Sequence, residues 1–341
     1  MTPSAQQAPG PDPSDSVSVL DQLAGAPAFT MSNGLVNAAV LLPDPKSGFY
    51  RGTRFDWSGQ ISRLTVGKQV IYQPWFDQTA PNIRDYVFFK DEVVAGPNTA
   101  ALGPVDAYDP VDPPGWAEAA AGESFLKIGV GLLRKPDDGA PYSSFRTYAI
   151  IDGGVWRVRT APLKVVFEHV VSANPGGYGY RYRKILRLDS RKPQLLIEHR
   201  LTNTGSKAFR TTSFNHNFLT LDGDPTGGGL ALTAPFDLAA GRPLRDVAEV
   251  AVDRLTFRRP LSGTEVFSTP ITGFAQTAAS YDLGLTNAAG KGFRVRSDRP
   301  ISSLLLWSIR RTVAIEPFIK IDLPPGKTED WSFTYTYSAG D

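Results

Sequence analysis

Short segments in which apolar and polar residues alternate recur along most of the chain. Their apolar positions are rich in Val, Ile, Phe, Tyr and Trp, the residue types that fit the pleated surface of a β-strand. The spacing is close to two residues, which is typical of strands. A period of two gives each segment one face for a core and one face open to solvent or ligand. The clearest examples are residues 60–66, 163–171, 178–186, 194–201, 292–297 and 331–337.

Helical spacing is scarce by comparison. Residues 115–121 fit a turn or two of helix, and residues 244–255 are ambiguous between helix and strand. The 32 glycines and 28 prolines are scattered through the chain, so they mark turns and not linkers. Residues 32–341 are therefore predicted to form one large all-β domain, an antiparallel sandwich or barrel. Residues 1–31, rich in Pro, Ala, Ser, Gln and Asp, are predicted to be a disordered leader.

Composition narrows the function classes. The net charge is +2, with acids and bases nearly balanced, so we expect neither a nucleic-acid nor a membrane partner. The sequence has no apolar run long enough to span a bilayer. It has no cysteine, which excludes disulfides, thiolate metal sites and thiol nucleophiles. The start of the chain lacks the pattern of a secretory signal, and the sequence leaves cytoplasm and periplasm open.

His216 is the first candidate for chemistry. It lies in the alternating segment 214–219, where Phe214 and Phe218 share its face and Asn215 lies on the other. A histidine between aromatic rings is either a general acid or a satisfied core residue. The other two histidines, His169 and His199, share strand faces with apolar residues and are predicted to be structural. No histidine spacing fits a zinc site.

A second candidate is the glycine-bounded segment 48–59, which holds Arg51, Arg54, Asp56 and Trp57. Arginine donors suit sugar hydroxyls, and an indole face suits the apolar face of a pyranose, so the segment is one candidate wall of a sugar site. The alternative is a turn in which Arg54 and Asp56 form an ordinary ion pair. Residues 96–122, rich in Asp and Pro, are predicted to be a loop.

Five motifs in the second half resemble those of aldose 1-epimerases (galactose mutarotases). Their order and approximate spacing agree over about residues 160–337, while the N-terminal half looks like a separate bacterial branch of the superfamily. The matching segments are 201–205 followed by 214–218, then 280–285, 293–300 with 304–307, 314–318, and 324–326 with 335–337.

The resemblance implies a β-supersandwich that holds a sugar or oligosaccharide in a concave groove, as a monomer or homodimer and without a cofactor or metal. His216 would protonate the ring oxygen, and Glu316 would take the proton of the anomeric hydroxyl. Glu316 follows Ile315 among apolar residues, which would raise its pKa. Asp282 would accept hydrogen bonds from sugar hydroxyls. The other expected contacts are Arg54 or Arg51, Asp56, Trp57, Asn215, Trp307 and Arg146.

The family carries a further histidine upstream, and the corresponding residues 142–156 contain none; Arg146 or Tyr148 would stand there. Three hypotheses therefore remain: an isomerase that interconverts anomers, a non-catalytic carbohydrate-binding module, and a lyase or hydrolase on the same scaffold. A hydrolase would need Glu316 paired with Asp282 or Asp56. A lyase would need a base and a cationic or tyrosine partner for a uronate.

Overall fold

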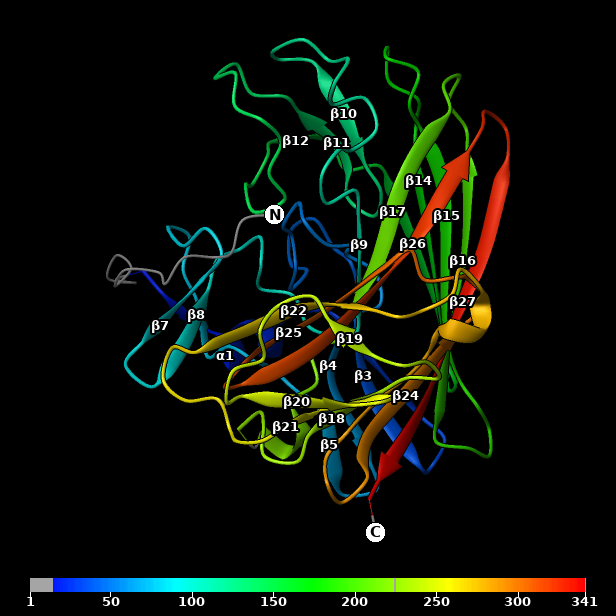
Figure 1. Cartoon of the computed structure of the whole chain (residues 1–341). Helices are drawn as coiled ribbons and strands as arrows, with labels where there is room; N and C mark the ends of the chain where they lie inside the picture. The colour runs from blue at the N-terminus through cyan, green and yellow to red at the C-terminus, as the bar shows by residue number, and fades with distance from the viewer. Residues whose placement is uncertain (1–14, 224, 341) are drawn as a thin grey trace.

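Strands make up nearly all of the regular structure in the computed structural model, which describes residues 15–223 and 225–340 (Figure 1). Every strand pair within these ranges is antiparallel except β6 with β8. None of the described helices is long and apolar enough to cross a membrane. The elements are β1 (Val17–Ser18), α1 (Val19–Gly25), β2 (Ala28–Ser32), β3 (Val36–Leu41), β4 (Ile61–Val66), β5 (Gln69–Tyr72), β6 (Gln78–Thr79), β7 (Tyr86–Phe89), β8 (Glu92–Ala95), β9 (Val105–Tyr108), β10 (Ser124–Lys127), β11 (Gly131–Arg134), β12 (Ile150–Asp152), β13 (Val155–Ala161), β14 (Lys164–Val171), β15 (Tyr180–Leu188), β16 (Gln194–Asn203), β17 (Phe209–His216), η1 (Leu221–Gly223), β18 (Ala231–Thr233), β19 (Ala239–Ala240), β20 (Ala248–Ala251), β21 (Arg254–Phe257), β22 (Val266–Thr272), η2 (Ala278–Ser280), β23 (Asp282–Thr286), β24 (Lys291–Ser297), β25 (Ser303–Ile309), β26 (Thr312–Leu323) and β27 (Thr328–Ala339).

The largest sheet has ten strands in the order β13-β14-β15-β16-β27-β24-β23-β18-β21-β20. Its long strands follow the alternation of the sequence. On β15, for example, Tyr180, Tyr182 and Leu186 are buried in the main core, while Arg181 and Arg187 on the opposite face are exposed. This sheet therefore has a buried inner face and a polar outer face.

A six-stranded sheet, β19-β22-β25-β26-β17-β9, is buried on both faces along β9, the end of β17 and the first half of β26. Ile315 and Ile319 of β26 belong to the main core, which the six-stranded sheet shares with the ten-stranded sheet. Phe214 and Phe218 face the other way, into a second core that includes Phe55 and many residues of the N-terminal half. Residues on this second face of β17 and β26 are thus covered by the N-terminal half of the chain.

The N-terminal half supplies three smaller sheets, β2-β3-β4-β5, β1-β6-β8-β7 and β10-β11-β12. Met31 on β2 and Val36 and Ala38 on β3 join the main core. Val93 on β8 and Phe125 on β10 join the second core. The N-terminal half therefore contributes to both hydrophobic cores.

The all-β, mainly antiparallel fold expected from the alternation is confirmed. The leader predicted for residues 1–31 is wrong for residues 17–31, which form β1, α1 and most of β2; residues 1–14 lie outside the described residues. Helix α1 is capped by Ser18, whose Oγ accepts from the Leu20 amide at 3.2 Å. The loop predicted for residues 96–122 contains β9, the strand that lies beside β17.

Candidate functional site

His216 and Glu316 meet because of the register between two strands. β17 and β26 are antiparallel with Phe214 opposite Phe318, so the positions two residues further along place His216 opposite Glu316. Nε2 of His216 lies 3.4 Å from Oε1 of Glu316. The two residues expected to act as acid and base thus lie side by side on the face that the N-terminal half covers.

Aromatic rings surround this pair. The imidazole of His216 is stacked on Phe218, with ring centroids 3.8 Å apart, and meets the edges of Phe55 at 5.9 Å and Trp307 at 5.8 Å. The side chains of His216 and Glu316 are only 5% and 8% exposed. Nδ1 of His216 has no hydrogen-bond partner among the described residues. The pair is therefore strongly desolvated.

Desolvation shifts both pKa values in the direction that favours the neutral form of each side chain. Burial raises the pKa of Glu316 to about 7, against the opposing effect of Arg54. Burial lowers the pKa of His216 well below 6.5, and Arg54 lowers it further. In mildly acidic solution the pair therefore holds one proton, on the carboxyl group, with a neutral imidazole beside it. Such a pair combines a proton donor and a proton acceptor within one site.

Arg54 is the charged group whose field reaches both members of the pair. Its side chain is 13% exposed and lies 3.8 Å from Asp85. Its guanidinium is 4.7 Å from the ring centroid of Phe55 and 4.3 Å from that of Phe145, and it donates to Thr99 at 3.3 Å. Arg54 is thus held beside Phe55, which contacts His216.

The other expected contacts on the N-terminal side bond to other groups. Arg51 is exposed and donates to the carbonyl of Lys46 at 2.5 Å. Trp57 is buried, with its indole N–H donating to the Gly52 carbonyl at 2.8 Å. Arg146 pairs with Asp138 at 2.6 Å. None of these three has a hydrogen bond or ion pair with His216 or Glu316 in the described part of the chain.

Asp282 is also separate from the pair. Its neighbours Leu283 and Leu285 on β23 point into the main core, and Asp282 binds Arg294 and Arg296, two exposed arginines of the adjacent β24. This cluster is on the outer face of the ten-stranded sheet, whereas His216 faces the second core. Of the substrate contacts expected from the sequence, Trp307 and Arg54 are the ones placed beside His216 and Glu316.

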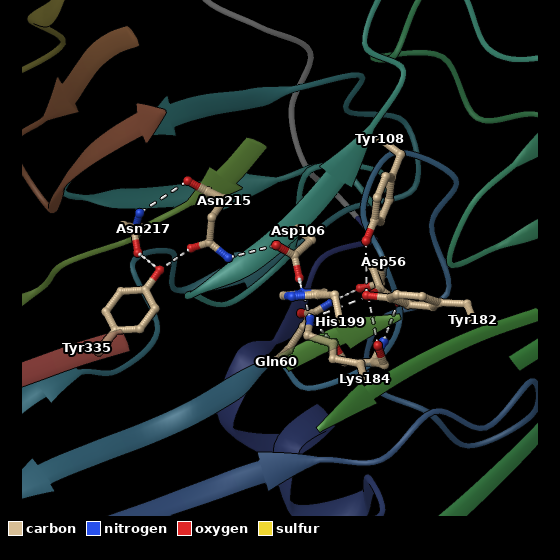
Figure 2. A network of polar contacts seen from close by, with 11 residues as sticks. Asp56, Gln60, Asp106, Tyr108, Tyr182, Lys184, His199, Asn215, Asn217 and Tyr335 are labelled. Carbon is tan, nitrogen blue, oxygen red and sulfur yellow. Dashed lines mark hydrogen bonds and ion pairs between the residues drawn. The ribbon is translucent and has the colours of Figure 1, made fainter. Parts of the chain in front are cut away.

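Asp56 and Asn215 belong to a buried polar network on the other face of β9 and β17, drawn in Figure 2. The ion pair between Arg54 and Asp56, which was the alternative to a sugar site for this segment, does not form: Asp56 lies 3.4 Å from Nζ of Lys184, and Arg54 lies beside Asp85. The segment around them is irregular, so residues two apart need not share a face. Nδ2 of Asn215 donates to Asp106 at 2.9 Å.

Asp106 is the centre of this network (Figure 2). It lies 2.6 Å from Nζ of Lys184 and 3.0 Å from Nε2 of His199, and all three side chains are buried. Burial acts to raise the pKa of Asp106, but Lys184 and His199 outweigh it and hold the pKa below its ordinary range. The network joins β9 to β15 and β16 across the main core. This is a structural role, which was also the expectation for His199.

Sequence reasoning missed Asp106 and Lys184. Asp106 stands in a segment whose Asp and Pro content is typical of loops, and Lys184 was one polar residue in an alternating strand. The signal for Lys184 was its place in the alternation of the strand. It shares the buried face of β15 with Tyr182 and Leu186. His169 is held by the Gly153 carbonyl and the Tyr180 hydroxyl, both at 2.8 Å, which also agrees with a structural role.

Two cavities of about 300 and 340 Å³ lie away from the pair. The first lies near the β25–β26 turn at Arg310 and Arg311, and the second on the outer face of β13 to β16. Neither includes His216 or Glu316. Across residues 15–223 and 225–340, no three His, Asp or Glu side chains gather in a way that would hold a metal ion.

Comparison with known proteins places the fold. No protein-family model and no curated protein matches the sequence. Among solved structures, a galactose mutarotase-like protein from Lactobacillus casei ATCC 334 is similar, with a TM-score of 0.52, 12% identity, and coverage of 92% of this chain and 100% of that one. The Slr1438 protein from Synechocystis sp. PCC 6803 gives a TM-score of 0.51, 13% identity, and coverage of 92% and 96%.

A galactose mutarotase related enzyme from Lactobacillus acidophilus gives a TM-score of 0.50 at 12% identity, over 92% of this chain and 98% of that one. Identities this low establish the fold alone. They agree with the resemblance drawn from the five sequence motifs. The chain has the galactose mutarotase-like β-sandwich fold.

Proposed function

We propose that the protein binds a sugar at His216 and Glu316 and interconverts its anomers by acid–base catalysis. The observation that carries the proposal is the 3.4 Å approach of Nε2 of His216 to Oε1 of Glu316 in a desolvated site. The ring oxygen and the anomeric oxygen of a sugar are bonded to the same carbon. A donor and an acceptor that lie close together in one site can therefore each reach one of these two oxygens.

The pKa values favour a particular division of roles. Protonated Glu316 donates to the ring oxygen while neutral His216 accepts the proton of the anomeric hydroxyl. The bond between the anomeric carbon and the ring oxygen breaks, and an open-chain aldehyde forms. Rotation about the neighbouring carbon–carbon bond and reversal of both proton transfers give the other anomer. This division is the reverse of the one that the family resemblance implies.

Arg54 contributes to the same step. When Glu316 gives up its proton, a carboxylate forms in a site where burial disfavours charge. The guanidinium of Arg54 opposes that effect of burial, and the imidazolium formed on His216 supplies a second positive charge beside the carboxylate. The two proton transfers thus produce an ion pair and not two isolated buried charges.

A non-catalytic carbohydrate-binding protein is the second candidate. The near-complete burial of both side chains favours it, because a sugar reaches them only if the surrounding aromatic side chains move. The absence of a histidine from residues 142–156 points the same way. A hydrolase with paired carboxylates is less well supported, since neither Asp56 nor Asp282 contacts Glu316 among the described residues.

The two candidates are separated by measuring anomer exchange with NMR saturation transfer on α-glucose, α-galactose and related hexoses. Wild type should accelerate exchange of at least one sugar, and Glu316→Gln and His216→Ala should reduce that acceleration by about 10²–10⁴-fold. Glu198→Gln, at a half-buried outer-face residue that pairs with Arg187, serves as the matched control and should be unaffected.

Sugar binding by calorimetry without any acceleration by wild type would establish the binding protein instead. Full activity in Glu316→Gln would reject this pair as the catalytic site. Circular dichroism of each variant shows whether the fold is retained, so that a loss of activity can be assigned to chemistry.

A further inference from the structure

The outer face of the ten-stranded sheet carries a groove that the proposed function does not use. It has a volume of about 340 Å³ and runs over β13, β14, β15 and β16, on the face opposite the main core. Four arginines and one glutamate line it, so its charged lining has a net charge of +3, whereas the whole chain carries only +2. The volume is within the range of small-ligand sites, roughly 300–1,000 Å³.

Strand register gathers most of this charge in one row. Arg157 lies opposite Glu168, Glu168 opposite Arg183, and Arg183 opposite Arg200. Arg181, two residues before Arg183 on β15, is the fourth arginine. Neighbouring positions in such a row are about 5 Å apart, and same-face positions along one strand are about 7 Å apart. The groove thus presents several guanidinium groups on the scale of a sugar ring.

Internal acids neutralise only part of this charge. Arg200 is paired with Asp330, at 2.8 and 3.1 Å. Glu168 is held by Arg159 at 2.8 Å and lies 3.8 Å from Arg183.

Two arginines therefore remain for a ligand. Arg157 and Arg181 have no ion pair among the described residues. Nε of Arg183 is buried and has no hydrogen-bond partner within the same ranges.

Arg183 lies directly opposite Arg200, although Glu168 and Asp330 offset part of the repulsion between them. Like charges directly opposite one another on antiparallel strands destabilise a sheet. A neutral residue at either position would remove that repulsion without disturbing the core, because both side chains are on the outer face. Local departures of this kind from the stability rules concentrate at functional sites.

The surroundings of the arginines exclude two classes of polymer. Six of the eight lining residues are on β14, β15 and β16, strands whose backbones are already paired on both sides, so a peptide cannot add as a further strand over them. The lining has no aromatic side chain on which a nucleic-acid base would stack.

The remaining lining suits a carbohydrate. The methyl groups of Val155 and Val170 can contact the C–H face of a sugar, and Thr202 offers a hydroxyl. Guanidinium forks bind carboxylates in bidentate fashion. From the charge, the dimensions and the lining together, we propose that this groove binds an acidic oligosaccharide through the carboxylates of its uronic acid units.

The test is calorimetric titration of the full chain with trigalacturonate at low salt, with maltotriose as the neutral probe. Wild type should bind trigalacturonate and not maltotriose. Arg181→Gln and Arg183→Gln should each weaken binding by at least 10-fold, and added salt should weaken it further. The matched control Arg210→Gln, at an exposed arginine of the other large sheet, should leave affinity unchanged.

Two readouts keep this proposal separate from the proposed sugar site. Glu316→Gln should leave trigalacturonate affinity unchanged; a loss there would place the ligand at His216 and Glu316 and overturn the outer-face assignment. Arg183→Gln should unfold at a urea concentration no lower than wild type, because it relieves the repulsion with Arg200. No binding of trigalacturonate to wild type, equal affinity in both groove variants, or tighter binding of oligothymidylate would also refute the proposal.

Discussion

Replacing Glu316 by Gln should change how stability depends on pH. In the folded protein burial raises the pKa of this carboxyl from 4.5 to about 7. Between these values the folded state binds a proton that the unfolded state has released, so the free energy of unfolding falls as pH rises. A difference of roughly 2.5 pKa units at about 1.4 kcal/mol each gives a loss of about 3 kcal/mol, complete above pH 7. Gln carries no charge at any pH and does not show this loss.

Urea unfolding of wild type and Glu316→Gln at pH 4.5 and pH 8.5 measures the effect. The other titrating groups are common to both proteins and cancel in the difference between them. Relative to wild type, the variant should gain about 3 kcal/mol on going from the lower to the higher pH. The control variant Glu198→Gln, on the outer face of the ten-stranded sheet, should show no such gain. A stability difference between Glu316→Gln and wild type that is the same at both pH values would refute the raised pKa and the acid role built on it.

Two further predictions concern the buried network and its surroundings. Lys184→Met removes the cation closest to Asp106 and should lower the free energy of unfolding by about 3–5 kcal/mol; a loss below about 1 kcal/mol in chemical denaturation would mean that the network is not an ionic one. Gly129→Ala and Gly122→Ala both place a side chain at positive φ, but only at Gly129 does the new Cβ meet another group, Asp56 at 2.7–2.8 Å. Gly129→Ala should therefore be the less stable variant by about 1–3 kcal/mol in the same assay, and equal stabilities would contradict the close approach.

The strands were the most predictable part of the fold, because alternation reports directly which face of a strand is buried. β16 alternates along its whole length, and β15 alternates except at Ile185, which is buried although it lies between the inward-facing Lys184 and Leu186. The alternation does not show which strands pair with one another. His216 and Glu316 are 100 positions apart in the sequence, and only the register of β17 with β26 brings them together. Their association was expected from the family resemblance and not from the pattern itself.

Residues whose observed partners differ from the expected ones show where local sequence patterns stop being informative. An ion pair between Arg54 and Asp56 was one of two alternatives for residues 48–59, yet the two side chains lie in an irregular segment and bind different groups. Asp282 was assigned to a sugar from a motif, although its strand partner β24 presents Arg294 and Arg296 on the same face. Alternating arginines on a neighbouring strand are a signal for surface ion pairs, but that signal is usable only when the strand pairing is known.

The most direct test of the proposed chemistry is the pH dependence of anomer exchange between pH 5 and pH 9, on a sugar that the protein converts and with the exchange of buffer alone subtracted. If protonated Glu316 is the acid, the enzymatic rate is high below pH 7 and falls as the pH rises through about 7, when the donor proton is lost. A rate that instead rises through pH 7 and stays high at pH 9 would make the Glu316 carboxylate the base and contradict this assignment.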